Sequence, residues 1–489
     1  MNVKIRAMCL LALLISVRVW ALDVVLNGEP LSGGNIPADG ELFDYPQGRG
    51  VPLSLVIPPS LDRWHAAVDY RRGRLVLDES GAALLTSGRI LIRGNSRDLW
   101  LDGVLYQDVS RIDISQEETS ESSLEMWISW EGTEVLEELV QRFARSHGLS
   151  IEILTVPSIL PKVTATARTR TDAADVFMVQ SADLPELTAA GLIQPLDSLD
   201  TRDLTEKGRQ AFSRDGRLWA LPLYFDTQLV FYNPQLTAEP AADWTLADFE
   251  RLLAAVRDAG IVPAAWNAYS AYWLISFQLG FGKDSLVNPD GGLTVNDEPT
   301  RRALEYLLSL QDRGLADFRE REGMMSRFAL GETAVILSGS YSIPAFRQAG
   351  LNFKAAPYPM VDPMRSLPPL LDYKGLAVSR RTGSPVTARA LVSYLTDPGV
   401  QARLALELDK LPSGREGLEI FGEKGGEFRD VLLMSYERGA AIPPNDVYPI
   451  FKNTMWKLLS LALSRQMEPQ QLLDQGQLMI DEKIQRRER

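Results

Sequence analysis

From Leu124 onward, apolar strands alternate with amphipathic helices, and this pattern constrains the fold more than any other feature of the chain. The stretch "LEMWISW" predicts a strand, and the apolar residues from Val135 to Phe143 fall on one face of a helix that Gly148 ends. "LSIEILTV" and the continuously apolar "ADVFMVQ" predict two more strands, the second typical of a buried parallel strand. The alternation therefore predicts an α/β fold with a parallel sheet covered by helices.

The chain before this alternation has a different pattern. Residues 22–118 contain short apolar strands, including Leu75–Leu77 and Ile90–Ile92, each preceded by a Gly-Arg pair. Short strands separated by turn residues predict a small all-β module. Residues 119–123 end the polar, acidic stretch "SQEETSESS", whose composition is typical of a linker. We therefore expect a β-rich N-terminal extension at 22–118, a linker at 119–123 and a larger α/β unit after it.

Length and charge narrow the classes of function. A chain of 489 residues is too long for one ordinary hydrophobic core, so about two to four domains or lobes are expected. The formal net charge is −13. Nucleic acid and anionic membrane surfaces repel such a chain, so neither is an expected partner.

The first residues resemble an export signal. Lys4 and Arg6 precede an apolar run from Ala7 to Ile15, and Val19-Trp20-Ala21 follows. This pattern predicts a signal peptide at 1–21 with cleavage after Ala21, and a retained anchor is the alternative. The run is too short to span a membrane as a mature helix, and no later stretch is long and apolar enough. We expect a periplasmic or secreted protein with no membrane insertion after the signal is removed.

The supply of reactive side chains is small. The only cysteine, Cys9, lies inside the predicted signal, so the mature chain has no thiol for catalysis, disulfides or metal binding. His65 and His147 stand alone, and His147 ends a predicted helix, where a cation suits the helix dipole. We expect no cofactor and no metal, and the pattern favours binding over catalysis.

Five segments follow one another in a fixed order. They are "EMWISWEGTEVLEELVQRFARSHGLSIEIL", "ADVFMVQSADLPELTAAGLIQPLD", "GRLWALPLYFDTQLVFYNPQL", "FALGETAVILSGSY" and "YKGLAVSRRTGSPVTARALVSYLTDPGVQARLA". In this order they resemble the extracellular solute-binding proteins of bacterial ABC importers, in the carbohydrate-type group that includes maltose-binding protein. The resemblance covers residues 124–489.

The resemblance implies a periplasmic-binding-protein fold of two α/β lobes with a ligand in the cleft between them. Lobe one would comprise 124–225 with 373–412, and lobe two 230–352 with 430–489. Ligands in open α/β sheets sit beyond the carboxyl ends of strands, which agrees with a site between lobes. The implied partners are a small carbohydrate and the membrane permease subunits of an ABC importer, and a monomer is expected.

The stretch "EMWISWEGTE" supplies the first site candidates. Trp127, Trp130 and Glu131 come at or near the carboxyl end of a predicted strand. An indole covers the C–H face of a sugar, and a carboxylate accepts hydrogen bonds from its hydroxyls. Strand alternation places Trp127 and Trp130 on opposite faces, so we expect one of them to lie in the core.

The other candidates follow predicted strands or match the family's ligand positions. Asp183 also has the alternative role of capping its helix together with Glu186, and Asp226 that of a hinge hydrogen bond. An aromatic cluster such as "WNAYSAYW" is also compatible with a hydrophobic core. The candidates are Gln180, Asp183, Asp226, Asn267, Tyr272, Trp273, Ser340, Tyr341, Asp372 and Tyr373.

Three functions compete at this point. The first is a binding protein that delivers a sugar or oligosaccharide to an ABC importer. The second is a ligand-sensing receptor that docks to a membrane sensor or envelope partner through the N-terminal module. The third is an exported glycoside hydrolase, which needs two carboxylates flanking one bond. Glu131, Asp183 and Asp226 are acids of the expected cleft, but no pattern pairs them.

Overall fold

The computed structural model describes most of the chain. The described residues are 23–26, 29–30, 42–55, 64–77, 88–93, 96–101, 103–107, 109–116, 123–130, 132–169, 173–288, 291–442 and 444–488. The predicted signal peptide, most of the predicted linker and the candidate Glu131 lie outside them. None of the helices within these ranges combines the length and hydrophobicity needed to cross a membrane.

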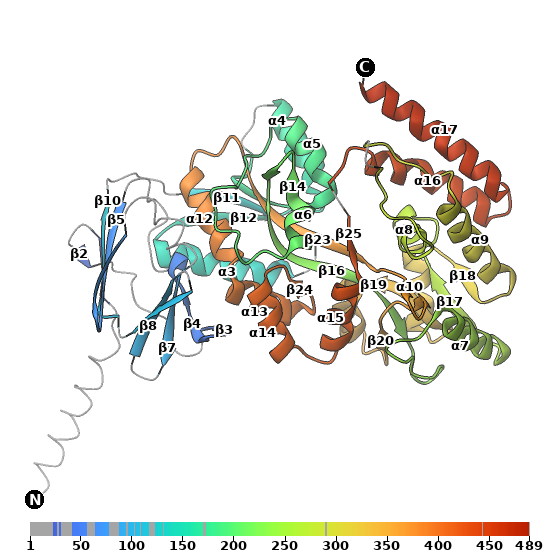
Figure 1. The fold of residues 1–489 in the computed structure, drawn as a ribbon, viewed down its shortest axis with the longest axis horizontal. Coiled ribbons are helices and arrows are strands. Elements are labelled where there is room, and N and C mark those ends of the chain that lie inside the picture. Colours follow the sequence, from blue (N-terminus) through green and yellow to red (C-terminus); the bar gives the residue numbers. More distant parts are fainter. Residues whose placement is uncertain are drawn as a thin grey trace, which may run out of the picture.

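One sheet runs through both lobes in the order β12-β11-β13-β23-β16-β19-β17-β18 (Figure 1). At one end β11 pairs in parallel with β12 and β13, and at the other β17 pairs in parallel with β18 and β19. The bounds are β11 (Ser123–Ile128), β12 (Ser150–Thr155), β13 (Val176–Gln180), β16 (Leu221–Tyr232), β17 (Val262–Trp266), β18 (Ala316–Phe318), β19 (Thr333–Gly339) and β23 (Leu370–Val378). We call the part around β11–β13 lobe one and the part around β17–β19 lobe two.

Two antiparallel strands, β16 and β23, join the lobes. All of β16 is buried, as expected of a strand covered on both sides. Short strands border these two: β20 (Lys354–Ala356) and β24 (Leu411–Pro412) pair with β16, and β25 (Ala440–Ala441) pairs with β23. Two small hairpins complete the strands of this region: β14 (Ser213–Arg214) with β15 (Arg217–Leu218), and β21 (Met360–Asp362) with β22 (Arg365–Ser366).

The helices confirm the predicted periodicity. In α3, Leu136, Leu139 and Phe143 are buried, and Gly148 ends the helix at a positive φ of 64°. The helices of lobe one are α3 (Thr133–His147), α4 (Ile159–Thr169), α5 (Leu184–Ala189), α6 (Glu206–Phe212), α12 (Pro385–Leu395) and α13 (Pro398–Leu408). Helices α14 (Arg415–Lys424) and α15 (Arg429–Arg438) follow. Those of lobe two are α7 (Leu246–Asp258), α8 (Ala271–Gly280), α9 (Glu298–Asp312), α10 (Arg321–Ala329), α11 (Ile343–Gln348), α16 (Tyr448–Leu463) and α17 (Pro469–Glu488).

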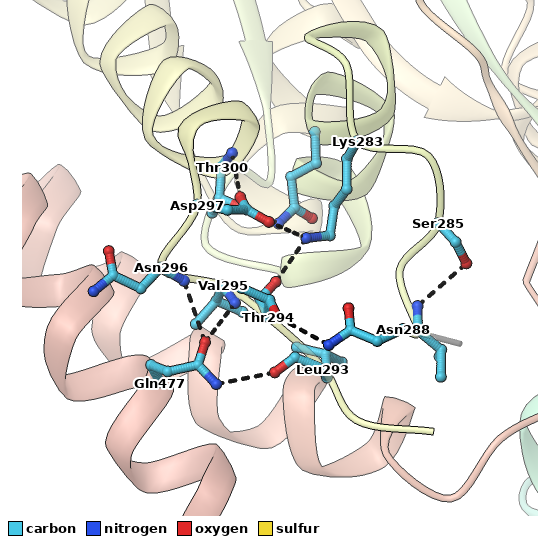
Figure 2. A network of polar contacts seen from close by, with 12 residues as sticks. Lys283, Ser285, Asn288, Leu293, Thr294, Val295, Asn296, Asp297, Thr300 and Gln477 are labelled. Carbon is cyan, nitrogen blue, oxygen red and sulfur yellow. Dashed lines mark hydrogen bonds and ion pairs between the residues drawn. The ribbon is translucent and has the colours of Figure 1, made fainter. Parts of the chain in front are cut away.

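The last helix is held to lobe two by polar contacts (Figure 2). The Gln477 side chain accepts a hydrogen bond from the Val295 N–H at 2.8 Å and donates one to the Leu293 carbonyl at 3.1 Å. Lys283 donates to the Thr294 carbonyl at 2.7 Å and pairs with Asp297. These contacts fix α17 against the segment that precedes α9.

The N-terminal extension contains two five-stranded sheets, in the orders β2-β1-β10-β5-β6 and β3-β4-β7-β8-β9. The predicted strands at Leu75–Leu77 and Ile90–Ile92 lie within β6 and β7. The bounds are β1 (Asp23–Leu26), β2 (Glu29–Pro30), β3 (Phe43–Tyr45), β4 (Gly48–Pro52), β5 (Trp64–Tyr70), β6 (Gly73–Leu77), β7 (Arg89–Arg93), β8 (Ser96–Leu101), β9 (Val104–Tyr106) and β10 (Arg111–Gln116). We call this extension the β module.

The β module packs against α3, α12, α13 and α14 of the larger unit through β3 and the short 3-10 helix Leu53–Leu55. The Arg142 guanidinium of α3 lies 4.5 Å from the ring centroid of Phe43. His147 Nε2 lies 2.7 Å from the Ser54 carbonyl oxygen, and burial lowers the pKa of His147 to about 4. The imidazole is therefore neutral at pH 7, which corrects the prediction of a cation at this helix end.

Candidate functional site

Trp127 lies in the core of lobe one. It is only 1% exposed, and its indole N–H donates to Glu125 Oε1 at 2.6 Å. The Lys162 ammonium from α4 covers the ring at 4.2 Å from its centroid. The prediction of Trp127 as a ligand contact is therefore wrong, because strand alternation turns this side chain under the helix. The expectation that one of the two tryptophans is a core residue is confirmed.

Trp130 lies just beyond β11 in an unusual backbone conformation. Its φ is 67°, in the left-handed region that few residues other than glycine adopt. The ring is half-buried, and the Lys374 ammonium lies 5.0 Å from its centroid. A cation at this distance is attracted by the ring face. The adjacent candidate, Glu131, lies outside the described residues.

The return strand β23 presents Asp372 and Lys374 on one face. Lys374 Nζ donates to Asp372 Oδ2 at 2.5 Å, and the lysine is almost fully buried while the aspartate is half-buried. Tyr373, between them, points to the other face, where it is completely buried 4.5 Å from the Phe225 ring. The prediction of Tyr373 as a site residue is therefore wrong, again because alternate residues of a strand face opposite sides.

Gln180 and Asp183 form a local turn at the end of β13. The Gln180 N–H donates to Asp183 Oδ2 at 3.0 Å within a capping box around the turn Ser181–Asp183. Asp183 occupies the N-cap position of α5, as predicted, but its side chain forms no capping hydrogen bond with that helix. Burial raises the pKa of Asp183 to about 6, with the Lys374 charge acting in the opposite direction and the Asp372 charge adding to the increase.

Lobe two contributes tyrosines to the same region. Burial raises the pKa of Tyr272, at the start of α8, well above its usual value, and the Asp372 charge adds to this increase. Tyr448, in the first turn of α16, also has a pKa raised by burial and then by Asp372. Trp273 packs edge-to-face on Tyr272, with 5.3 Å between the ring centroids, and is itself buried. Trp273 therefore supports Tyr272 from the core side.

Two further candidates, Tyr341 and Asn267, also belong to lobe two. Tyr341 is half-buried, its ring 5.2 Å from the Arg321 guanidinium, and its phenol acts on the pKa of Tyr272. Asn267 follows β17, and its side-chain amide donates to Glu320 Oε2 at 3.0 Å. Both side chains are half-buried. Their contact with a ligand stays a prediction.

Asp226 lies in a buried ion pair on the crossing strand β16. It is 2% exposed, and its Oδ1 accepts hydrogen bonds from Lys410 Nζ at 2.7 Å and Ser340 Oγ at 2.8 Å. Lys410 follows α13 of lobe one, and Ser340 follows β19 of lobe two. The prediction that Asp226 and Ser340 face a ligand is therefore wrong, because both are buried and Asp226 accepts hydrogen bonds from Ser340 and from the buried Lys410 ammonium. The alternative hinge role that the sequence left open for Asp226 agrees with these contacts.

Six residues from both lobes act on one another electrostatically or through direct contact around Asp372. We call them the interlobe cluster: Trp130, Asp183, Tyr272, Asp372, Lys374 and Tyr448. The set combines aromatic faces with carboxylates, phenols and an ammonium. Such a combination covers an apolar face and forms hydrogen bonds with many hydroxyls at once.

Lys374 and Tyr448 were not predicted from the sequence. A signal for Lys374 existed, because the residue two positions from Asp372 on a strand shares its face. Tyr448 comes from a helix far along the chain, and no local pattern connects it to Asp372.

The comparison with protein families decides what kind of protein this is. The family described as bacterial extracellular solute-binding proteins matches residues 138–418, more than half of the chain. The chain belongs to this family. The family and the relatives described below are binding proteins, and they confirm the family resemblance found in the sequence.

Two relatives illustrate the likeness in sequence. The maltodextrin-binding protein MdxE of Bacillus subtilis is 23% identical over 286 residues, which cover 56% of this chain and 68% of that protein. The maltotriose-binding protein of Pyrococcus abyssi is 26% identical over 256 residues, which cover 49% of this chain and 54% of that protein.

Solved structures show the fold. The GacH receptor of Streptomyces glaucescens superposes with a TM-score of 0.66 at 20% identity, covering 73% of this chain and 97% of the receptor. The maltotriose-binding protein of Thermus thermophilus superposes with a TM-score of 0.64 at 21% identity, covering 74% of this chain and all of that protein. The predicted two-lobed α/β fold is thereby confirmed.

Proposed function

We propose that this chain binds a sugar or oligosaccharide between its two lobes and delivers it to the permease subunits of an ABC importer. The interlobe cluster carries the proposal. The relatives named for maltodextrin and maltotriose binding support the choice of ligand class. A thermophilic relative of the same fold was solved with maltotriose bound.

The chemistry of the cluster fits a saccharide. Trp130 offers an indole face held by the Lys374 ammonium, and a sugar presents C–H groups to such a face. Asp372 and Asp183 accept hydrogen bonds from hydroxyls, and charged acceptors bind more strongly than neutral ones. Tyr272 and Tyr448 both donate and accept. These groups come from both lobes, so a bound sugar would contact both at once.

The proposal includes export and excludes catalysis. The mature protein starts near Leu22 after signal cleavage and acts as a monomer in the periplasm. The hydrolase alternative needs two carboxylates that are available to one glycosidic bond. Asp226 is buried and paired with Lys410, so it does not fit that role.

Titration calorimetry with the purified mature chain tests the proposal. The ligands are maltose, maltotriose and a galactooligosaccharide. Trp130→Ala removes one stacking face and is expected to weaken binding by roughly tenfold, the equivalent of about 1.4 kcal/mol. The matched control is Trp456→Ala on α16, whose indole is 51% exposed and lies outside the cluster. Equal affinities of the two variants, or no heat with any of the sugars, would contradict the proposal.

A receptor is the second candidate, and the packing of the β module favours it. The β module shares its hydrophobic core with lobe one, so it moves with that lobe and could transmit its position to a membrane sensor. A photo-crosslinking residue at Val104, exposed on β9, identifies the partner in intact cells. Capture of a sensor would support this second function, and capture of permease subunits alone would exclude it.

A further inference from the structure

A completely buried glutamine on the crossing strand β16 connects two elements that carry members of the interlobe cluster. The Oε1 atom of Gln228 accepts hydrogen bonds from the Ser276 hydroxyl at 2.6 Å and from the Leu370 N–H at 3.0 Å. Ser276 belongs to α8, and Leu370 is the first residue of β23. One oxygen atom therefore holds a helix of lobe two and a crossing strand together.

Both donors lie close along the chain to a member of the interlobe cluster. Tyr272 comes one helical turn before Ser276, at the i, i+4 spacing that shares a helix face. Asp372 comes two residues after Leu370, at the spacing that shares a face of a strand. The Asp372 charge also adds to the raised pKa of Tyr272, so the two groups act on one another electrostatically. Gln228 therefore links the backbone segments that carry this carboxylate and this phenol.

A glutamine at this buried position has a cost that an apolar side chain avoids. Transfer of an amide group into the protein interior is unfavourable unless the group is hydrogen-bonded. The Nε2 atom of Gln228 has no hydrogen-bond partner among the described residues, so half of the amide gains nothing. The strand continues with the buried apolar and aromatic residues 229–232. What Gln228 contributes is therefore the pair of hydrogen bonds to Oε1, which fix α8 and β23 relative to each other.

We propose that Gln228 is a positioning residue for sugar binding, which holds the Tyr272 phenol and the Asp372 carboxylate at the separation that lets one sugar bind both. The inference rests on the proposed function. Gln228 does not contact the ligand, because it is completely buried. It acts through the two groups that it places. Hydrogen bonds weaken steeply when donor and acceptor move apart or out of line, so a shift of α8 against β23 weakens both contacts with the sugar at once.

A second buried glutamine provides a matched control. Gln228→Met keeps the approximate size of the side chain and removes the oxygen that accepts both hydrogen bonds. Gln278 lies on α8 and is equally buried, but its Nε2 donates to Thr300 Oγ1 of α9 at 2.8 Å, within lobe two. Gln278→Met therefore breaks a buried hydrogen bond of the same helix without breaking the link to β23. Both variants are expected to lower the melting temperature of the ligand-free protein, because each leaves a buried polar group unpaired.

Titration calorimetry with maltotriose, at a temperature where all variants are folded, separates positioning from a general loss of stability. Gln228→Met is expected to bind about fivefold to tenfold more weakly than the unmodified mature chain, roughly the loss of one neutral hydrogen bond. Gln278→Met is expected to keep its affinity. Ser276→Ala breaks the same link from the side of α8, so the double variant Gln228→Met/Ser276→Ala should bind no more weakly than Gln228→Met alone.

The surroundings of Tyr272 can also be followed without any sugar. Fluorine NMR of the chain labelled with 3-fluorotyrosine gives one resonance that Tyr272→Phe removes, and this resonance belongs to Tyr272. It is expected to shift in ligand-free Gln228→Met, because α8 is no longer held against β23. In Gln278→Met it is expected to stay in place.

Each result has a distinct meaning. A shifted Tyr272 resonance together with weaker maltotriose binding in Gln228→Met, and neither change in Gln278→Met, supports the proposal. Equal affinities of these two variants, a Tyr272 resonance that Gln228→Met does not move, or additive losses in the double variant would each overturn the positioning role and leave the proposed sugar binding intact. An unmodified chain that binds no sugar would overturn the proposed function, and this inference with it.

Discussion

At the scale of single residues, the ion pair between Asp226 of the crossing strand β16 and Lys410 has almost no contact with water. The Asp226 and Lys410 side chains are both buried, and Ser340 supplies one more hydrogen bond to the carboxylate. Removing two charges from water costs several kcal/mol, which their mutual attraction offsets only while both are present. The intact pair therefore adds little to overall stability, and it joins the residue after α13 to the crossing strand β16.

Asp226→Ala is expected to reduce the free energy of unfolding by about 3–5 kcal/mol, because the Lys410 ammonium stays buried without a counter-charge. Urea denaturation of the ligand-free protein measures the change. The double variant Asp226→Ala/Lys410→Met removes both charges and should recover most of the loss. If Asp226→Ala instead left unfolding unchanged and abolished maltotriose binding, Asp226 would be a ligand contact after all.

At the scale of elements, β3 joins the β module to lobe one where α13 begins. Phe43 and Tyr45 lie so close to Gly399 that an added Cβ would come within 2.8 Å of the Tyr45 ring and 2.9 Å of the Phe43 Cβ. Gly399 has no positive φ, so it is the close approach of β3, and not the backbone, that requires a glycine here.

Gly399→Ala is expected to push β3 away from α13 and to cost about 1–3 kcal/mol, the usual range for overpacking. Hydrogen exchange followed by mass spectrometry should show faster exchange in Phe43–Tyr45, with little change in the sheet of lobe two. Gly426→Ala is the control, since nothing lies within 4 Å of an added Cβ there. The same exchange in both variants would argue against this packing role.

Elements of this kind show what the sequence could and could not reveal. Periodicity predicted the α/β alternation, the helix α3 that ends at Gly148, and the placement of Trp127 and Trp130 on opposite faces with one of them in the core. These features could be predicted because they depend on neighbours along the chain. The pairing of Asp226 with Lys410 joins residues 184 positions apart, so it depends on the complete fold. Tyr373 was predicted wrongly and Lys374 was not predicted for a simpler reason. Side chains alternate along β23, so Lys374 shares the face of Asp372 and Tyr373 lies on the opposite face.

At the scale of the whole molecule, the two lobes touch outside the crossing strands. Arg214, on the small β14–β15 hairpin of lobe one, pairs with Asp446, just before α16 of lobe two, at 2.7 Å. Arg347 of α11 pairs with Asp409 at the end of α13 in a second contact between the lobes. Both pairs are partly exposed, so each contributes on the order of 0–1 kcal/mol. Contacts of this size shift an equilibrium between open and closed lobes without fixing it.

Maltotriose is expected to bring the lobes closer together, because a ligand that contacts the interlobe cluster binds the closed arrangement best. Small-angle scattering should show a smaller radius of gyration with saturating maltotriose than without it. Asp446→Asn removes one interlobe ion pair, so the ligand-free variant should be slightly more open and bind up to about fivefold more weakly, the equivalent of 1 kcal/mol. At saturation it should reach the same radius as the unmodified protein, because the ligand then supplies the closing contacts. Asp474→Asn changes an exposed carboxylate of α17 that takes part in neither interlobe ion pair, so it should change neither quantity. A radius of gyration that is the same with and without maltotriose would mean that the sugar binds lobes already closed.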